Sequence, residues 1–184
     1  MQPPHTTPHS SLYFNYQVYP APPAPKAPEV VPVLVIGAGP VGLTTAVLLA
    51  RAGVRCTVVT AEQQVCDGSR AIAFTRRSLE ILQQTGAHRA FDALGLPWGC
   101  GNSFYRGQRV FRMEAAHSPQ DRFAPLTNLQ QQFVEQALID EVARLLDVLD
   151  AGLHIVLLTA RPIRVQPQTL GWLLRYQLRW DLLI

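Results

Sequence analysis

The chain has 184 residues, enough for one domain of ordinary size with its own hydrophobic core and too few for a second complete domain. Hydrophobic residues make up 48% of it and charged residues 16%, a globular composition that excludes a disordered or fibrous chain. The formal charge of +3 comes from basic residues spread along the sequence without a dense block, which argues against a nucleic-acid-binding surface.

Residues 1–29 are predicted to form a Pro-rich N-terminal arm. Nine of the fifteen prolines lie between Pro3 and Pro32, among Ser, Thr, His and Tyr residues that follow neither helical nor strand periodicity. The order of charged and apolar residues does not match a secretory signal peptide. The arm also carries an aromatic cluster that could dock on the folded body, formed by Tyr13, Phe14, Tyr16 and Tyr19.

The next thirty residues predict one βαβ unit. The continuous apolar run from Val33 to Ile36 is typical of a strand buried on both faces in a parallel sheet. Residues Val41 to Ala52 are almost wholly apolar and end at Gly53, which indicates a buried helix with a glycine just past its C-terminus. The β-branched residues between Arg55 and Thr60 predict the second strand.

Further elements follow in chain order. A helix is expected from Arg76 to Gln84, ending at Gly86, with a short helix after it. The segment from Gly99 to Met113, centred on Arg106-Gly107, predicts a β-hairpin outside the first sheet. Apolar residues at three- and four-residue spacing between Gln130 and Asp147 indicate a long amphipathic helix, and residues 153–159 predict a further strand.

The segment Gly37-Ala38-Gly39-Pro40-Val41-Gly42 matches the G-x-G-x-x-G dinucleotide fingerprint. A pyrophosphate needs backbone N–H groups and the positive end of a helix close to it, and glycine allows that approach. The first glycine permits the tight turn, the second admits the phosphates, and the third lets helix and strand pack closely. A glycine-rich turn can also simply cap a strand, but the position between a strand and a helix favours dinucleotide binding.

The fingerprint departs from its usual pattern at the second strand. An acid commonly lies at the end of that strand, about twenty residues on, and binds the ribose hydroxyls. Thr60 occupies this position, followed by Ala61, while Glu62 could act from the loop or be an ordinary solvated carboxylate. We therefore include Thr60 and Ala61 in the predicted cofactor site.

Residues Val33 to Leu146 resemble the FAD-dependent aromatic monooxygenases, the group that includes the phenol and 3-hydroxybenzoate-type hydroxylases. The resemblance rests on four pieces of sequence: Val35 to Thr44, Asp67 to Ile72 followed by Arg77 to Ile81, Phe104 to Gly107, and Asn128 to Gln131. It implies an α/β fold, with a partial Rossmann-like FAD-binding domain built on a parallel βαβ core, a hairpin excursion and a long amphipathic helix.

By this resemblance, Arg70 with Ala71 and Gln131 occupy positions where the family contacts FAD. Each position has a plainer alternative. Arg70 could be a solvated loop arginine, and Gln131, three residues after Asn128, could belong to a capping box that starts a helix. The catalytic residues stay unknown, and the scattered histidines and cysteines show no metal-ligand spacing.

The resemblance also implies a function: hydroxylation of a phenolic substrate with O2, FAD as cofactor and NADPH or NADH as co-substrate. The family's second FAD motif contains Gly-Asp, a dipeptide absent from this sequence. We therefore expect an incomplete FAD-binding domain over residues 30–160, a divergent tail over residues 161–184, and a chain that is inactive alone. The alternatives are a non-catalytic remnant that does not bind flavin productively and, with less support, an NAD-dependent dehydrogenase.

Three cysteines without a CxxC pair favour a reducing compartment, and we expect a cytoplasmic protein. The expected partner of the complete enzyme is a small aromatic molecule. No nucleic acid and no membrane is expected as a partner, and a homodimer is left open.

Overall fold

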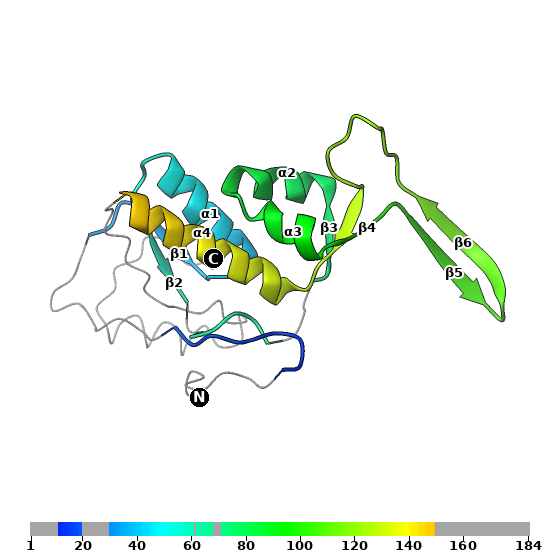
Figure 1. Cartoon of the computed structure of the whole chain (residues 1–184), viewed down its shortest axis with the longest axis horizontal. Helices are drawn as coiled ribbons and strands as arrows, with labels where there is room; N and C mark the ends of the chain where they lie inside the picture. The colour runs from blue at the N-terminus through cyan, green and yellow to red at the C-terminus, as the bar shows by residue number, and fades with distance from the viewer. Residues whose placement is uncertain (1–10, 20–29, 61, 68–70, 150–184) are drawn as a thin grey trace.

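The computed structural model describes residues 11–19, 30–60, 62–67 and 71–149. Within these residues a parallel strand pair and four helices form the body, and a hairpin projects from one end (Figure 1). The mixed architecture confirms the predicted α/β class. The predicted strand at residues 153–159, the tail at 161–184, Ala61 and Arg70 lie outside the described residues, so the predicted domain boundaries stay predictions.

The predicted βαβ unit is confirmed. Strand β1 (Leu34–Ile36) is parallel to β2 (Thr57–Val59), with Leu34 opposite Thr57 and Ile36 opposite Val59. Helix α1 (Pro40–Arg51) connects them, and the chain leaves it through Gly53 at φ +73°. The first strand therefore ends where the first turn of α1 begins, which is the geometry that the fingerprint requires.

The prediction that the first strand is buried on both faces is wrong. All three residues of β2 are buried, but Leu34 and Ile36 of β1 are 47% and 60% exposed. Val35 faces the other way and packs against the small core cluster of Ala46, Cys56 and Val58. A continuous apolar run carries no information about how many faces of a strand are covered, because that depends on elements distant in sequence.

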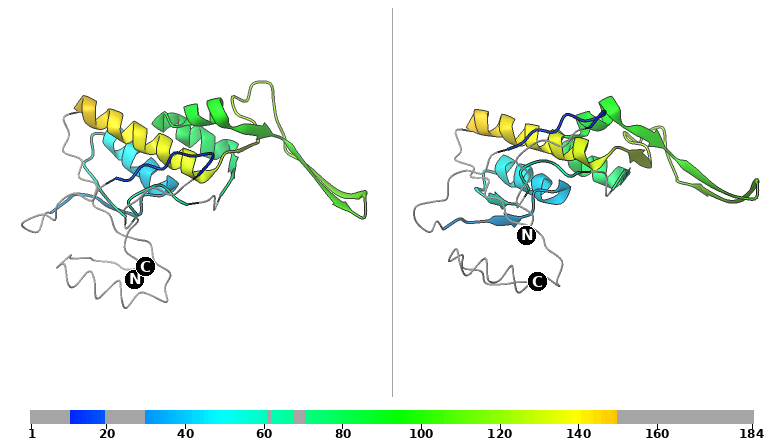
Figure 2. Two further views of the ribbon diagram at one scale, coloured as in Figure 1. Left: turned by 60° about the horizontal axis from the view of Figure 1, so that its bottom comes forward. Right: turned by 90° about the horizontal axis from the view of Figure 1, so that it is seen from below.

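Helix α4 (Gln131–Leu149) lies along α1 and buries the predicted amphipathic face (Figure 2). Val134, Leu138 and Val142 are nearly inaccessible, and they share one core cluster with Leu43 and Val47 of α1. The spacing of the apolar residues places them on one side of the helix. Burial of this face fixes α4 beside the fingerprint helix.

Helices α2 (Arg76–Thr85) and α3 (His88–Leu94) complete the helical layer and confirm the two predicted helices. The Thr75 hydroxyl accepts a hydrogen bond from the backbone N–H of Ser78 and so caps the start of α2. Helix α2 ends at Gly86, as predicted.

A small antiparallel sheet was missed by the sequence analysis. It has the order β3 (Ala73–Thr75), β7 (Leu126–Asn128) and β4 (Leu96–Trp98). Each strand has three residues and β4 contains Pro97, so no alternation was available to predict them. The sheet joins the segment before α2 to the segment before α4.

Strands β5 (Cys100–Tyr105) and β6 (Gln108–Glu114) form the predicted hairpin, with Arg106 and Gly107 at its turn. The hairpin extends away from the body in every view (Figures 1 and 2). Within the described part of the chain, no helix combines the length and hydropathy needed to cross a membrane.

Candidate functional site

The fingerprint forms a tight turn between β1 and α1 whose geometry requires glycine at two positions. Gly37 has φ +103°, in the region that L side chains rarely adopt, and its N–H donates to the Val59 carbonyl of β2 at 2.7 Å. A Cβ added to Gly42 would lie 1.9 Å from the Gly37 carbonyl oxygen. Gly42 therefore allows the first turn of α1 to pack directly against the end of β1.

The middle glycine has a different environment. The nearest atom to a Cβ built on Gly39 would be Glu135 Oε1 at 3.9 Å, so the protein itself leaves room for a side chain there. Gly39 precedes Pro40 at the start of α1, and the first turn of that helix has no acidic residue. Val41, next in the turn, is 82% exposed. The turn thus leaves room at Gly39 beside the positive end of a helix, a combination that suits an anionic group.

A buried carboxylate from α4 lies beside this turn. Glu135 is 4% exposed, and its Oε2 accepts a hydrogen bond from the Cys66 backbone N–H at 2.7 Å. Its Oε1 accepts from the Gln131 side-chain nitrogen at 2.6 Å. Two hydrogen bonds to a buried carboxylate compensate much of its desolvation. Glu135 therefore connects the start of α4, the loop after β2 and the glycine turn.

Sequence analysis missed Glu135. The available signal was its position four residues after Gln131, since residues at that spacing lie on the same face of a helix. Gln131 itself is placed next to the glycine turn through Glu135, and its contact with FAD stays a prediction. The capping-box alternative is wrong, because Asn128 lies in β7, before the start of α4, and its side-chain oxygen accepts from Trp98 Nε1 at 2.8 Å.

At the end of β2, where the fingerprint usually has an acid, this chain has the hydroxyl of Thr60. Thr60 is buried, and its Oγ1 accepts a 3.4 Å hydrogen bond from the Glu62 backbone N–H, while Glu62 is exposed. The next stretch turns inward, since Gln64 and Val65 are 7% and 4% exposed. The roles of Thr60 and Ala61 toward a ribose stay predictions.

Two other pieces of the resemblance come together. The Leu129 N–H donates to the Ile72 carbonyl at 2.8 Å, which continues the β3–β7 pairing and brings exposed Ala71 to the start of α4. The predicted contact residues Ala71 and Gln131 thus belong to neighbouring segments, whereas the Phe104–Gly107 hairpin lies away from the glycine turn (Figure 1). Because Gly39 also lies beside Glu135 of α4, the glycine turn and the segments that carry Ala71 and Gln131 meet near the start of α4.

Comparison with known proteins identifies the protein family to which the chain belongs. The chain matches the family described as "FAD binding domain" over residues 30–151, and it belongs to this family. The fold and the glycine turn agree with that assignment, and FAD is the family's cofactor. The confirmed resemblance is thus to the N-terminal portion of FAD-dependent aromatic monooxygenases.

Among curated relatives, the chain is 32% identical over 109 residues to the 6-methylpretetramide 4-monooxygenase of Streptomyces rimosus, covering 59% of this chain and 20% of that protein. It is 50% identical over 54 residues to the 3-(3-hydroxy-phenyl)propionate/3-hydroxycinnamic acid hydroxylase of Comamonas testosteroni, covering 29% of this chain and 9% of the relative. The chain thus spans a fifth or less of the length of these two relatives.

The chain is also similar to solved structures of monooxygenases. The flavin-dependent monooxygenase PieE, determined with FAD and substrate, matches with a TM-score of 0.53 and 30% identity over 65% of this chain and 23% of that one. The p-nitrophenol 4-monooxygenase PnpA of Pseudomonas putida DLL-E4 matches with a TM-score of 0.57 and 25% identity over 63% of this chain and 30% of that one.

Proposed function

We propose that the βαβ unit of this chain binds the adenine half of FAD, with the pyrophosphate at the glycine turn. The observation that carries this proposal is that a Cβ added to Gly39, directly before the N-terminus of α1, would meet no protein atom closer than 3.9 Å. The backbone there and the helix end supply donors and positive potential, and the neighbouring Glu135 carboxylate already accepts hydrogen bonds from the Cys66 N–H and from Gln131. Gly37, Ala38, Pro40, Val41 and Gly42 shape this turn.

The other predicted contacts extend from the turn in two directions. Thr60 and Ala61 are proposed for the ribose side, next to the end of β2. Arg70, Ala71 and Gln131 are proposed for the rest of the cofactor, and Glu135 fixes the orientation of the Gln131 amide through their 2.6 Å hydrogen bond. These residues bind and orient the cofactor, which supplies hydride acceptance and reaction with oxygen when bound.

We further propose that the complete protein hydroxylates a phenolic or related aromatic substrate, using NADPH or NADH and O2. Support comes from the family and from relatives whose names describe monooxygenases and hydroxylases of aromatic compounds. A cytoplasmic location is also proposed, supported by the absence of a CxxC pair among the three cysteines of the sequence. A homodimer is a further proposal that oligomeric-state measurements would test.

Purified chain titrated with FAD tests the cofactor proposal. We expect a yellow complex with perturbed flavin absorbance and quenched flavin fluorescence. Absence of bound flavin at high micromolar FAD would overturn the proposal and favour the alternative, a remnant that does not bind flavin productively. The reaction class is tested separately, by following NADPH and NADH oxidation with a panel of phenols and searching for the hydroxylated product by mass spectrometry.

A further inference from the structure

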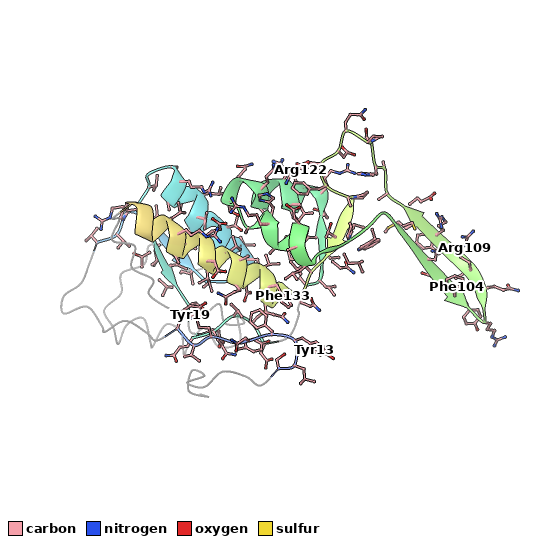
Figure 3. The ribbon with its side chains drawn as sticks, viewed as in Figure 1. Tyr13, Tyr19, Phe104, Arg109, Arg122 and Phe133 are labelled. Carbon is pink, nitrogen blue, oxygen red and sulfur yellow. The ribbon has the colours of Figure 1, made fainter. Side chains whose placement is uncertain are left out.

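The aromatic cluster of the N-terminal arm packs against helix α4. Phe14 contacts Phe133 of α4 edge to face, with ring centroids 5.0 Å apart, and the Phe14 ring also meets the Tyr16 ring at 4.8 Å. Tyr16 is 6% exposed. Figure 3 shows Phe133 on the side of α4 that faces the arm, with Tyr13 and Tyr19 along the arm. The docking of the arm, which the sequence left open, is thus present in the structure.

Tyr19, the last described residue of the arm, connects the arm to the loop after β2. Its backbone N–H donates to the Gln63 carbonyl of that loop at 2.7 Å. Its hydroxyl accepts a hydrogen bond from the Gln136 side-chain nitrogen of α4 at 2.8 Å. One residue of the arm is therefore bonded both to the loop and to α4.

The same loop is attached on its other side to the carboxylate that borders the glycine turn. The Cys66 N–H donates to Glu135 Oε2 at 2.7 Å, and Glu135 Oε1 accepts from the Gln131 side-chain nitrogen at 2.6 Å. A Cβ added to Gly39 would lie 3.9 Å from that Oε1. Contacts thus run from the arm through the loop and Glu135 to Gly39 and Gln131, two of the positions proposed for FAD.

The loop depends on these contacts for its geometry. Residues 62–67 belong to neither a helix nor a strand, so no regular hydrogen-bond pattern fixes them. A site whose walls are ordered before the ligand arrives binds more tightly, because the cost of ordering them does not reduce the affinity. Detachment of the arm would remove one attachment of the loop and loosen the segment that donates to Glu135.

We propose that the docked arm is part of the FAD-binding unit, with Phe14 and Tyr19 as positioning residues that order the loop after β2 and so raise the affinity for FAD. This assignment rests on the proposed binding of FAD at the glycine turn. Neither residue touches the cofactor, and both act through the loop and Glu135. Because coupling between two sites is reciprocal, bound FAD in turn stabilises the docked arm.

The first test compares the FAD affinities of Phe14→Ala and Tyr13→Ala in the full chain, measured by equilibrium dialysis. Both substitutions remove one aromatic ring from neighbouring positions of the arm, but Tyr13 is 85% exposed. Loss of the edge-to-face contact should weaken FAD binding about fivefold, the size expected for one aromatic pair, while Tyr13→Ala stays within about twofold of the wild type. Phe14→Leu, which keeps an apolar contact with α4, should recover part of the affinity.

Hydrogen exchange measures the coupling in the reverse direction. The Tyr19 N–H is bonded to the Gln63 carbonyl, so its exchange reports opening of the arm. Saturating FAD should slow this exchange in the wild type by about the same fivefold factor. The amides of the β5–β6 hairpin are the internal control, because the hairpin lies away from the glycine turn (Figure 1), and their exchange should not change. A contact that serves stability alone would show no dependence on FAD.

The outcomes separate the role of the arm from the proposed function. If the wild type binds FAD and Phe14→Ala binds it equally well, the role of the arm is wrong and the proposed function stands. Unchanged exchange of the Tyr19 N–H on addition of FAD would also overturn this role. So would faster exchange throughout β1 and β2 in Phe14→Ala, since the loss of affinity would then reflect general unfolding. If the wild type itself binds no FAD, the proposed function is wrong and the role of the arm fails with it.

Discussion

Substitution of Gly42 by alanine should separate the packing role of the fingerprint from its ligand-binding role. The added Cβ would lie 1.9 Å from the Gly37 carbonyl oxygen and 3.0 Å from its carbonyl carbon. Both atoms are backbone, so relief requires that β1 and α1 move apart by about 1 Å or more. Overpacking of this kind costs about 1–3 kcal/mol, and the better helix propensity of alanine returns up to about 1 kcal/mol. We expect a net loss of about 1–2 kcal/mol.

Urea denaturation followed by far-UV circular dichroism measures this loss as a lower midpoint at unchanged slope. Gly101→Ala is the matched control, because the nearest atom to its added Cβ is a Trp98 ring carbon at 3.8 Å. We expect that variant to stay within about 0.5 kcal/mol of the wild type. An equal or higher stability for Gly42→Ala would refute the close packing of α1 on β1.

Gly39→Ala has space for its Cβ, with the nearest atom at 3.9 Å, so it should lower the free energy of unfolding by less than about 1 kcal/mol. It should weaken FAD binding at least about tenfold in fluorescence titrations, because the Cβ would occupy the space of the pyrophosphate. Equal affinity would show that the pyrophosphate does not bind at this turn. Tyr19→Phe removes the 2.8 Å hydrogen bond from Gln136 and loosens the arm, whose Tyr19 N–H donates to the Gln63 carbonyl, so amide hydrogen exchange in residues 62–67 should become faster. Tyr13→Phe is the control, because Tyr13 is 85% exposed, and it should leave this exchange unchanged. Burial raises the pKa of the Cys56 thiol above its ordinary value of 9.0, so Cys56 should react with a thiol reagent more slowly than exposed Cys100. The stabilisation from the buried neutral thiol should be full below pH 9 and decrease as the pH rises above that value. Equal labelling rates for the two cysteines would contradict the burial of Cys56.

The elements that the sequence predicted are those specified by local patterns. The glycine turn, helix α1 and the two parallel strands follow from one contiguous stretch, and α4 follows from the spacing of Val134, Leu138 and Val142. The hairpin follows from two runs around Arg106-Gly107. Each of these signals lies within the element that it predicts.

What could not be predicted depends on contacts between distant segments. The exposure of Leu34 and Ile36 depends on what covers β1, which the apolar run cannot reveal. The sheet that joins β3, β7 and β4 is built from three-residue strands that are stable only together. Glu135 became a candidate only when the fold placed α4 beside the glycine turn. Part of the site therefore follows from sequence motifs, and part from the packing of α4.

The central claim is that the glycine turn between β1 and α1 binds the adenine half of FAD. Competition against FAD bound to the full chain tests it most directly, with ADP or FMN as the competitor and the FAD that stays bound after gel filtration, quantified by chromatography, as the signal. ADP carries the adenosine and the pyrophosphate, whereas FMN carries the flavin half with one phosphate. We predict that ADP releases the bound flavin and that FMN at the same concentration does not. Release by FMN without release by ADP would contradict the claim.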